Sequence, residues 1–226
     1  MNRASGPIRL VTAVPFLLLV GFLVFPVAGA VIRGLVMGPG SSFESTIISP
    51  ITQRVLLFSV YQAVLSTALS VLLGLPGAFL LARLRFPGRS LVRASLIVPF
   101  VLPPIVVVVG FIRLFGSYGV VDSVLMLITG SSASIVDLAS GVPGIVLAHA
   151  FYNTPLVILM VSSSLERLNP ELEESAELLG ADTLQRLRHV VIPHILPSLM
   201  ASAILTFLFC FMSFPIVLSL GAGRYK

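Results

Sequence analysis

Residues 166–197 read ERLNPELEESAELLGADTLQRLRHVVIPHILP, and this polar stretch governs the interpretation of the whole chain. It contains six of the nine acidic residues and lies between two long apolar runs. Asn169 is a suitable helix N-cap, and Pro170 suits the first helical position. Gly180 is placed to end the helix in a left-handed turn. The pattern therefore predicts a short capped helix between Asn169 and Gly180.

One face of this predicted helix is apolar, because Leu172, Ala176 and Leu179 recur at helical spacing. An amphipathic helix outside the bilayer must bury that face on lipid, on its own protein or on a partner. The acidic residues of its first turn argue against an anionic lipid surface. The stretch is therefore interpreted as a docking element for a soluble protein. The alternative is a solvated loop that joins two membrane spans.

A second short helix is predicted directly after Gly180. Asp182 or Thr183 can cap its beginning. Pro193 is expected to end it, because proline has no backbone N–H and its ring clashes with the preceding helical turn. Two capped helices separated by a glycine are more structure than a simple connecting loop needs.

Composition defines the fold class. The 226 residues are 57% hydrophobic and only 10% charged, with a mean hydropathy of +1.08. Soluble domains carry about 25% charged residues. The apolar runs are long rather than short and alternating, so an all-α integral membrane protein is predicted instead of a barrel. The basic residues border these runs, so they indicate topology and not a nucleic-acid partner.

A single transmembrane domain over residues 1–226 is expected, embedded in a lipid bilayer. Its five expected spans cover about 10–32, 55–82, 94–115, 143–165 and 198–220, and its polar loop covers 166–197. For the first run, a cleaved secretory signal with a site near residues 28–30 is the alternative.

Four arginines, at positions 83, 85, 89 and 93, place the second loop inside by the positive-inside rule. The N-terminus is then cytoplasmic, and parity places residue 226 outside.

Polar residues and prolines inside the apolar runs are the candidates for a translocation path. Asn153 falls near the bilayer centre, where an amide must face protein or a cavity, and Tyr152 and Thr154 flank it. Helix–helix hydrogen bonding by Asn153 is the alternative. Pro103 and Pro104 are expected to kink their span beside such a path.

No catalytic, cofactor-binding or metal-binding site is predicted. Cys210 is the only cysteine, and His149 has no second histidine or cysteine at ligand spacing. The only lysine is Lys226, so the chain has no Walker loop for ATP. If ATP drives this protein, another polypeptide must bind the nucleotide.

The polar stretch resembles the cytoplasmic signature loop of binding-protein-dependent ABC importer permeases. That signature is Glu-Ala-Ala, three residues, Gly, nine residues and Ile-x-Leu-Pro. The matching residues are Glu174, Ser175, Ala176, Gly180, Val190, Ile192 and Pro193, with Ser175, Val190 and Ile192 as substitutions. The resemblance implies a MetI-like permease core in a prokaryotic cytoplasmic (inner) membrane. It also implies a coupling helix that seats on an ATPase subunit through Glu174, Ser175, Ala176, Leu179, Gly180 and Pro193.

A narrower resemblance concerns the solute. The segments LRFPGR (84–89), GIVLAH (144–149), FYNTPL (151–156) and FMSFPIVLSLGAG (211–223) are similar to thiamine importer permeases, and ferric-iron permeases have related segments. The resemblance implies thiamine as substrate, with ferric iron or another small solute as the alternative. In that family a further span follows the last segment, so a truncated, inactive permease half is also considered.

The partners implied by the resemblance are cytoplasmic ATP-binding cassette subunits, an extracellular or periplasmic substrate-binding protein and a second permease half or copy. The protein itself is not expected to be an enzyme. An ion-driven secondary transporter is the contrasting hypothesis, but it requires a membrane-embedded acid or histidine relay. The apolar runs contain no aspartate or glutamate.

Overall fold

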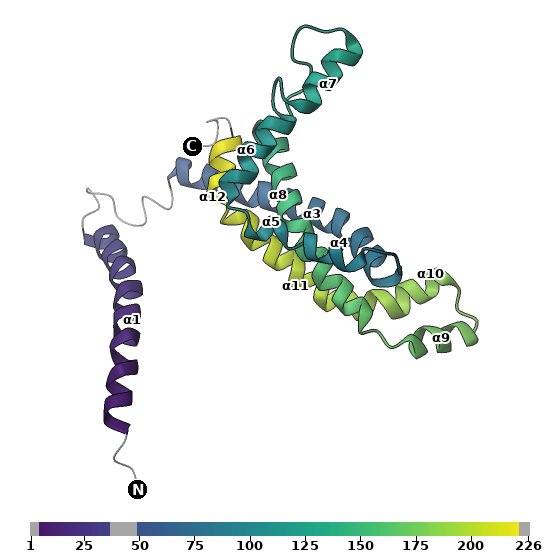
Figure 1. Ribbon diagram of the computed structural model, residues 1–226, viewed down its shortest axis with the longest axis horizontal. Coiled ribbons are helices and arrows are strands. Elements are labelled where there is room, and N and C mark those ends of the chain that lie inside the picture. Colours follow the sequence, from purple (N-terminus) through teal and green to yellow (C-terminus); the bar gives the residue numbers. More distant parts are fainter. Residues whose placement is uncertain (1–4, 37–48, 222–226) are drawn as a thin grey trace. The chain divides into compact units, whose positions relative to one another are not determined.

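The structure, a computed structural model, describes residues 5–36 and 49–221. Within these ranges it is helical, and no strand is present (Figure 1). The prediction of an all-α membrane protein is confirmed. The chain divides into two compact units, Met1–Arg54 and Val55–Lys226.

The first unit contains the helix α1 (Ser5–Val36), which is 32 residues long and includes Pro15 and Pro26. Its segment Ala13–Arg33 is long and apolar enough to cross a membrane. The predicted first span, 10–32, therefore lies within one helix.

The remaining helices run from α3, which begins at the end of the first unit, to α12. Their bounds are α3 Pro50–Arg83, α4 Arg89–Ser95, α5 Val98–Val101, α6 Pro104–Phe115, α7 Val120–Thr129, α8 Gly141–Glu166, α9 Pro170–Leu178, α10 Thr183–Arg186, the π-helix η1 Leu187–Val191, α11 Ile192–Phe211 and α12 Phe214–Leu220. Besides the segment in α1, the described segments that are long and apolar enough to span are Pro50–Arg83, Pro104–Thr129, Gly141–Glu166 and Thr183–Phe211.

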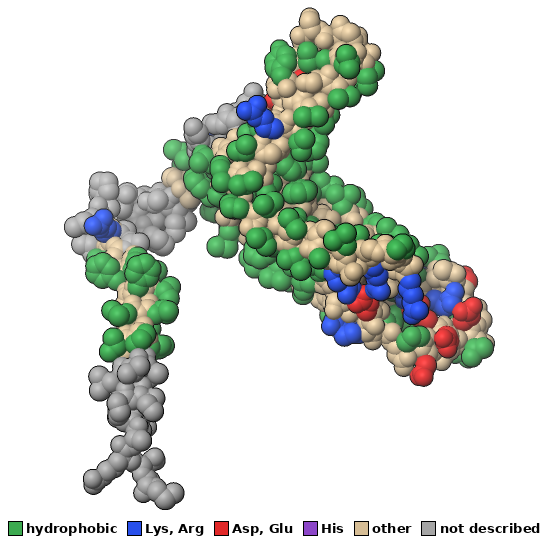
Figure 2. Space-filling view, viewed as in Figure 1, with side chains coloured by type: hydrophobic (Ala, Val, Ile, Leu, Met, Phe, Trp, Pro, Cys, Tyr) green, Lys and Arg blue, Asp and Glu red, His purple; other side chains and the backbone are tan. Residues whose placement is uncertain are grey.

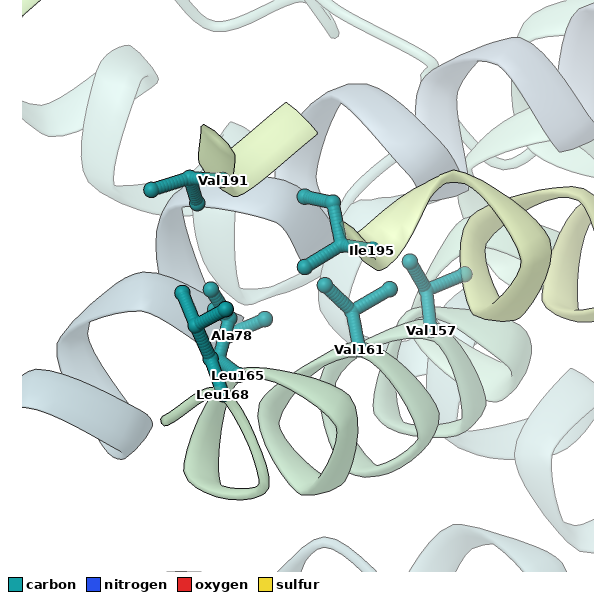
Figure 3. Close-up of a cluster of buried hydrophobic side chains, with 7 residues drawn as sticks. All are labelled: Ala78, Val157, Val161, Leu165, Leu168, Val191 and Ile195. Carbon is teal, nitrogen blue, oxygen red and sulfur yellow. The ribbon is translucent and has the colours of Figure 1, made fainter. Parts of the chain in front are cut away.

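The central helix of the second unit is α8, which packs against α11, α12, α6 and α5. One cluster of buried side chains joins α3, the end of α8 and the beginning of α11 (Figure 3). Its members are Ala78, Val157, Val161, Leu165, Leu168, Val191 and Ile195. The helix α7 precedes one end of α8 and α9 follows the other, so α7 and α9 lie at opposite ends of this helix (Figure 1).

Small residues on α3 form the face that packs on α8. Ser66, Ser70, Gly74 and Ala78 recur every four residues and are buried. A Cβ atom at Gly74 would lie 2.6 Å from the Cβ and Cγ1 atoms of Val157. The absence of a side chain at Gly74 therefore lets the two helices approach closely, as small residues do in membrane bundles.

Replacing Gly74 with alanine is expected to destabilise the protein by about 1–3 kcal/mol, since the new methyl group overlaps Val157. Thermal unfolding in detergent measures the effect. Gly110→Ala is the matched control, because a Cβ there meets no atom within 4 Å. Adding Val157→Ala to Gly74→Ala should recover part of the loss. Equal unfolding temperatures for Gly74→Ala and Gly110→Ala would contradict this packing.

Residues 94–115, the third predicted span, do not form one continuous helix. The chain forms α4, α5 and α6 there, separated by short breaks. Leu102 is extended, with ψ 131°, because a following proline disfavours the helical conformation. By length and composition, the candidate span in this region is Pro104–Thr129, which begins with α6 and ends with α7.

The prediction that Pro193 ends a helix is also wrong. The helical segment continues from Thr183 to Phe211. Pro193 is the second residue of α11, directly after the π-helix η1 and within this continuous helical segment. The last helical region also differs from the predicted 198–220, because α11 ends at Phe211 and α12 follows it.

The segment between α6 and α8 is organised by one buried acid. Asp122 is 1% exposed, and its carboxylate accepts hydrogen bonds from the backbone N–H groups of Tyr118, Ile135 and Val136 at 2.8–2.9 Å. These bonds tie the start of α7 to the returning chain. Asp122 therefore holds this segment in a defined conformation.

Candidate functional site

The helix α9 has the caps that the sequence predicts. The Asn169 side chain accepts a hydrogen bond from the backbone N–H of Glu171 at 3.1 Å, and Pro170 occupies the first helical position. At the other end Gly180 has φ 87°. The Gly180 N–H donates to the Glu177 carbonyl at 2.9 Å, and the Ala181 N–H donates to the Ala176 carbonyl at 3.0 Å. This pair of bonds is a Schellman motif.

A capping box begins α10 directly after this turn. The Asp182 carboxylate accepts from the Gln185 N–H at 2.7 Å, and the Gln185 side-chain oxygen accepts from the Asp182 N–H at 2.9 Å. Of the two predicted caps, Asp182 takes the position and Thr183 begins the helix. The turn between α9 and α10 is therefore fixed by hydrogen bonds on both sides.

The tip of this turn presents two leucines to the surroundings. Leu178 is 89% exposed and Leu179 is 88% exposed. The predicted face includes Leu179 but not Leu178. None of the residues of α9 is fully buried, and its leucines Leu172 and Leu178 are exposed. Exposed leucines on a charged segment mark an interaction surface.

The other predicted coupling residues lie around these leucines. Glu174, Ser175, Leu179 and Gly180 are exposed, whereas Ala176 is half-buried. Pro193 lies apart from them, exposed in the first turn of α11. α9 and its turn therefore bring together five of the six residues.

Ion pairs connect α9 and the end of α8 to the end of α3 and to α4. Arg83 pairs with Glu173 of α9, and Arg93 pairs with Glu166 at the end of α8. Arg89 also pairs with Glu166, at 2.5 Å. Figure 2 shows these charges gathered at the end of the helices that carries α4, α9 and α10, beyond a largely apolar surface.

Sequence reasoning missed these ion pairs, because it explained the arginines by topology alone. The partners are 73–90 residues apart in the chain. No spacing rule links such positions, so only the packing of α3 against α8 reveals them. A further pair, Arg186 with Glu177, joins α10 to α9.

Asn153 lies inside the bundle and is 1% exposed. Its side-chain nitrogen donates to the His149 carbonyl at 3.0 Å and to the sulfur of Cys210 on α11 at 3.4 Å. The alternative role as a helix–helix contact therefore has direct geometric support. A role for Asn153 in a translocation path stays a prediction.

More polar side chains surround Asn153 between α3, α8 and α11. The Gln62 side chain donates to the Cys210 carbonyl at 2.9 Å, and the Ser66 hydroxyl lies 3.3 Å from Nδ1 of His149. Within the described chain, buried polar atoms of Gln62, His149, Asn153 and Thr206 have no hydrogen-bond partner. Such a polar layer weakens helix packing relative to an apolar one, because unpaired polar atoms carry a desolvation cost.

The Tyr152 side chain contacts the non-helical residues that separate α5 from α6. Its hydroxyl donates to the Leu102 carbonyl at 3.1 Å, and its ring lies 5.8 Å from that of Phe100. Pro103 and Pro104 follow directly, so the helical hydrogen bonding is interrupted at this point. Tyr152 thereby stabilises the interrupted helix that the prolines create.

Tyr152→Phe is expected to destabilise the protein by about 0.5–1.5 kcal/mol, since the part-buried Leu102 carbonyl loses its donor. The unfolding temperature in detergent provides the measurement. Tyr61→Phe is a matched control, because Tyr61 is 54% exposed. An equal response of the two variants would show that the Tyr152 hydroxyl contributes no stability.

Thr154 lies beside an apolar hollow of about 530 Å³. Helices α3, α4, α5 and α8 line it, and Pro99 and Pro155 are among its residues. The other predicted path residues, Asn153, Tyr152, Pro103 and Pro104, are absent from this lining. The structure therefore does not gather the five predicted path residues around this hollow. No group of three or more metal-ligating side chains occurs within residues 5–36 and 49–221.

The family model for binding-protein-dependent transport system inner membrane components matches residues 71–225. This chain belongs to that family. Members are transport permeases rather than enzymes. The match includes the stretch from α8 through α9 and α10 to α11, where the signature resemblance was found.

Two kinds of permease are among the similar sequences. The thiamine transport system permease protein ThiP of Brucella abortus is 31% identical over 208 residues, covering 91% of this chain and 38% of the relative. The sulfate transport system permease protein CysT of Salmonella typhimurium is 38% identical over 134 residues, covering 59% of this chain and 46% of the relative. The chain thus spans less than half the length of these relatives.

A solved structure with the same fold is a bacterial ABC transporter that imports the acidic polysaccharide alginate. It matches with a TM-score of 0.68 at 19% identity, over 96% of this chain and 78% of the other. A related structure, the alginate transporter in complex with a pentasaccharide-bound periplasmic protein, has a TM-score of 0.71 at 17% identity and coverage of 99% and 82%. These matches confirm the MetI-like permease fold.

Proposed function

We propose that this chain is the membrane permease subunit of an ATP-driven importer and that α9 is its coupling helix. The family match supports the first part. The single observation that carries the second is the exposure of Leu178 and Leu179 at a turn fixed by caps on both sides. A rigid apolar tip on a polar segment is suited to a groove on another protein.

In this proposal the permease performs no chemistry. ATP hydrolysis by a partner subunit moves α9, and the membrane helices then alternate between outward and inward openings. A separate binding protein delivers the solute, and a second permease half or copy completes the path. The coupling requires that α9 contact the ATPase differently in two states.

The proposed orientation places α4, α9 and α10 in the cytoplasm. The arginines at 83, 85, 89, 93, 167, 186 and 188 all lie at this end of their helices, as the positive-inside rule requires. The N-terminus then lies in the cytoplasm and α7 lies outside.

Thiamine is the proposed solute. The support is the similarity to thiamine permeases over 91% of the chain, which exceeds the 59% covered by the sulfate permease CysT. Sulfate is the second candidate, because the shared segment with CysT is 38% identical. Ferric iron remains a third, on the sequence resemblance alone.

Uptake by cells that carry the complete transporter tests the proposal. Labelled thiamine, sulfate and ferric iron are compared as separate tracers. We expect thiamine uptake that disappears when the Walker lysine of the ATPase subunit is replaced and persists when an ionophore abolishes ion gradients. Uptake of sulfate alone would replace the proposed solute. Uptake that follows the ion gradient and ignores the ATPase variant would refute the importer proposal.

A further inference from the structure

We propose that three arginines of the α3–α4 corner clamp the root of α9 and transmit its movement to the membrane helices. Arg83 holds Glu173, while Arg89 and Arg93 hold Glu166. These five are positioning residues, and the inference rests on the proposed role of α9 as the coupling helix.

Arg89 is the centre of this clamp because it contacts three helices. It is the first residue of α4, its Nε donates to the Leu81 carbonyl in the last turn of α3 at 2.8 Å, and its Nη2 donates to Glu166 at 2.5 Å. Leu81 O is one of the carbonyls that a helix end leaves without a helical partner. One guanidinium therefore joins the ends of α3, α4 and α8.

Glu166 and Arg89 each lie at a helix end whose dipole disfavours their charge. Glu166 is the last residue of α8, where the helix dipole disfavours an anion, and Arg89 begins α4, where it disfavours a cation. Each charge is therefore stabilised by the other helix rather than by its own. This cross-helix pairing is what a link between α4 and α8 requires.

The clamp lies at the end of the apolar cluster that joins α3, α8 and α11. Leu165 and Leu168 flank Glu166 in sequence and belong to that cluster. α9 buries none of its residues, so Arg83–Glu173 is a specific link between α9 and this core. A displacement of α9 therefore reaches α3 directly through Glu173, and it reaches α4 through the end of α8, where Glu166 is held.

All five side chains are 22–43% exposed, so their ion pairs contribute little to stability. Loss of the clamp should therefore change coupling without unfolding the protein. A change in coupling at unchanged stability would distinguish a positioning role from a merely structural one.

The test measures whether α9 and α4 move together in the complete transporter. Spin labels are attached at Ser90→Cys on α4 and Glu171→Cys on α9, both of which are exposed positions. Their distance is recorded without nucleotide and after vanadate has trapped the nucleotide that the ATPase hydrolyses. We expect one narrow distance in both states for the wild type. In Glu166→Arg the distribution should broaden and differ between the two states, with normal insertion and normal ATPase binding.

Two further variants make the test specific. Arg89→Glu and Arg93→Glu together with Glu166→Arg restore opposite charges and should restore the narrow distance. Arg85→Glu is the matched control, because it changes the charge of the same corner, and Arg85 has no ion pair among the described residues. We expect Arg85→Glu to give the same narrow distance as the wild type in both states. That result would show that the effect of Glu166→Arg does not come from a change of loop charge that alters the topology.

Two results would overturn the clamp. The first is a wild-type distance that itself shifts between the two states. The second is a Glu166→Arg variant whose distances match those of the wild type. Failure of the proposed function is seen separately, as a wild-type transporter in which no ATPase subunit is retained, and it would remove the basis of the clamp as well.

Discussion

Replacing Leu178 and Leu179 together with alanine is expected to weaken binding of the ATPase subunit about 100-fold, at an unchanged level of permease in the membrane. Full burial of one leucine side chain contributes about 1.5–3 kcal/mol, and both leucines are almost fully exposed in the chain by itself. Part of that gain is offset by the ordering of side chains at the interface. A net loss of about 3 kcal/mol corresponds to the expected factor.

The measurement is the affinity of the purified ATPase for the permease in nanodiscs. The matched control is Leu127→Ala with Ile128→Ala, two adjacent apolar residues on α7 that are 84% and 74% exposed. That pair lies at the end of α7, on the side opposite the one proposed to face the ATPase, so its loss should leave the affinity unchanged. Equal affinities for the two double variants would show that the tip of α9 is not the docking surface.

Gly180→Pro is expected to reduce ATP-driven uptake to background while the permease still inserts. Proline fixes φ near −65°, whereas Gly180 has φ 87°. It also removes the N–H that donates to the Glu177 carbonyl. The turn that orients α9 against α10 is then lost. A Cβ at this position would meet no atom within 4 Å, so conformation rather than space makes glycine necessary.

A series at this position separates conformation from other effects. Gly180→Asn should retain most of the uptake, because asparagine tolerates the left-handed conformation. Gly180→Ala should be intermediate, since a left-handed alanine costs about 1–2 kcal/mol. Uptake is measured together with the amount of inserted protein. The same uptake for all three variants would show that this turn has no part in coupling.

The local features of the candidate site could be predicted from the sequence, because they depend on residues within one or two helical turns. Asn169, Asp182 and Gly180 act through short-range capping and turn geometry. Pro193 was misjudged by the same local reasoning. The π-helix before it changes the hydrogen-bonding register, and the buried side chains of Val191 and Ile195 hold the continuing helix against α8.

Long-range contacts could not be predicted from local pattern. Arg83 and Glu173 are 90 residues apart, and Gln62 reaches the Cys210 carbonyl across 148 residues. The depth of Asn153 in its apolar run correctly indicated burial, yet its partners depend on how α8 meets α11. The break before α6 lies at Pro103 and Pro104, where the sequence predicts a kink.

The π-helix η1 lies within the helical rod from Thr183 to Phe211, between α10 and α11. It sets the rotation of α10 about the rod axis relative to α11. A π turn accommodates one residue more than an α turn, and one residue corresponds to about 100° of rotation in an α-helix. Deleting a single residue within Leu187–Val191 is expected to leave the rod continuous and to rotate α10 about the rod axis relative to α11. The direction in which α9 points is therefore encoded in a single surplus residue some ten positions downstream of it.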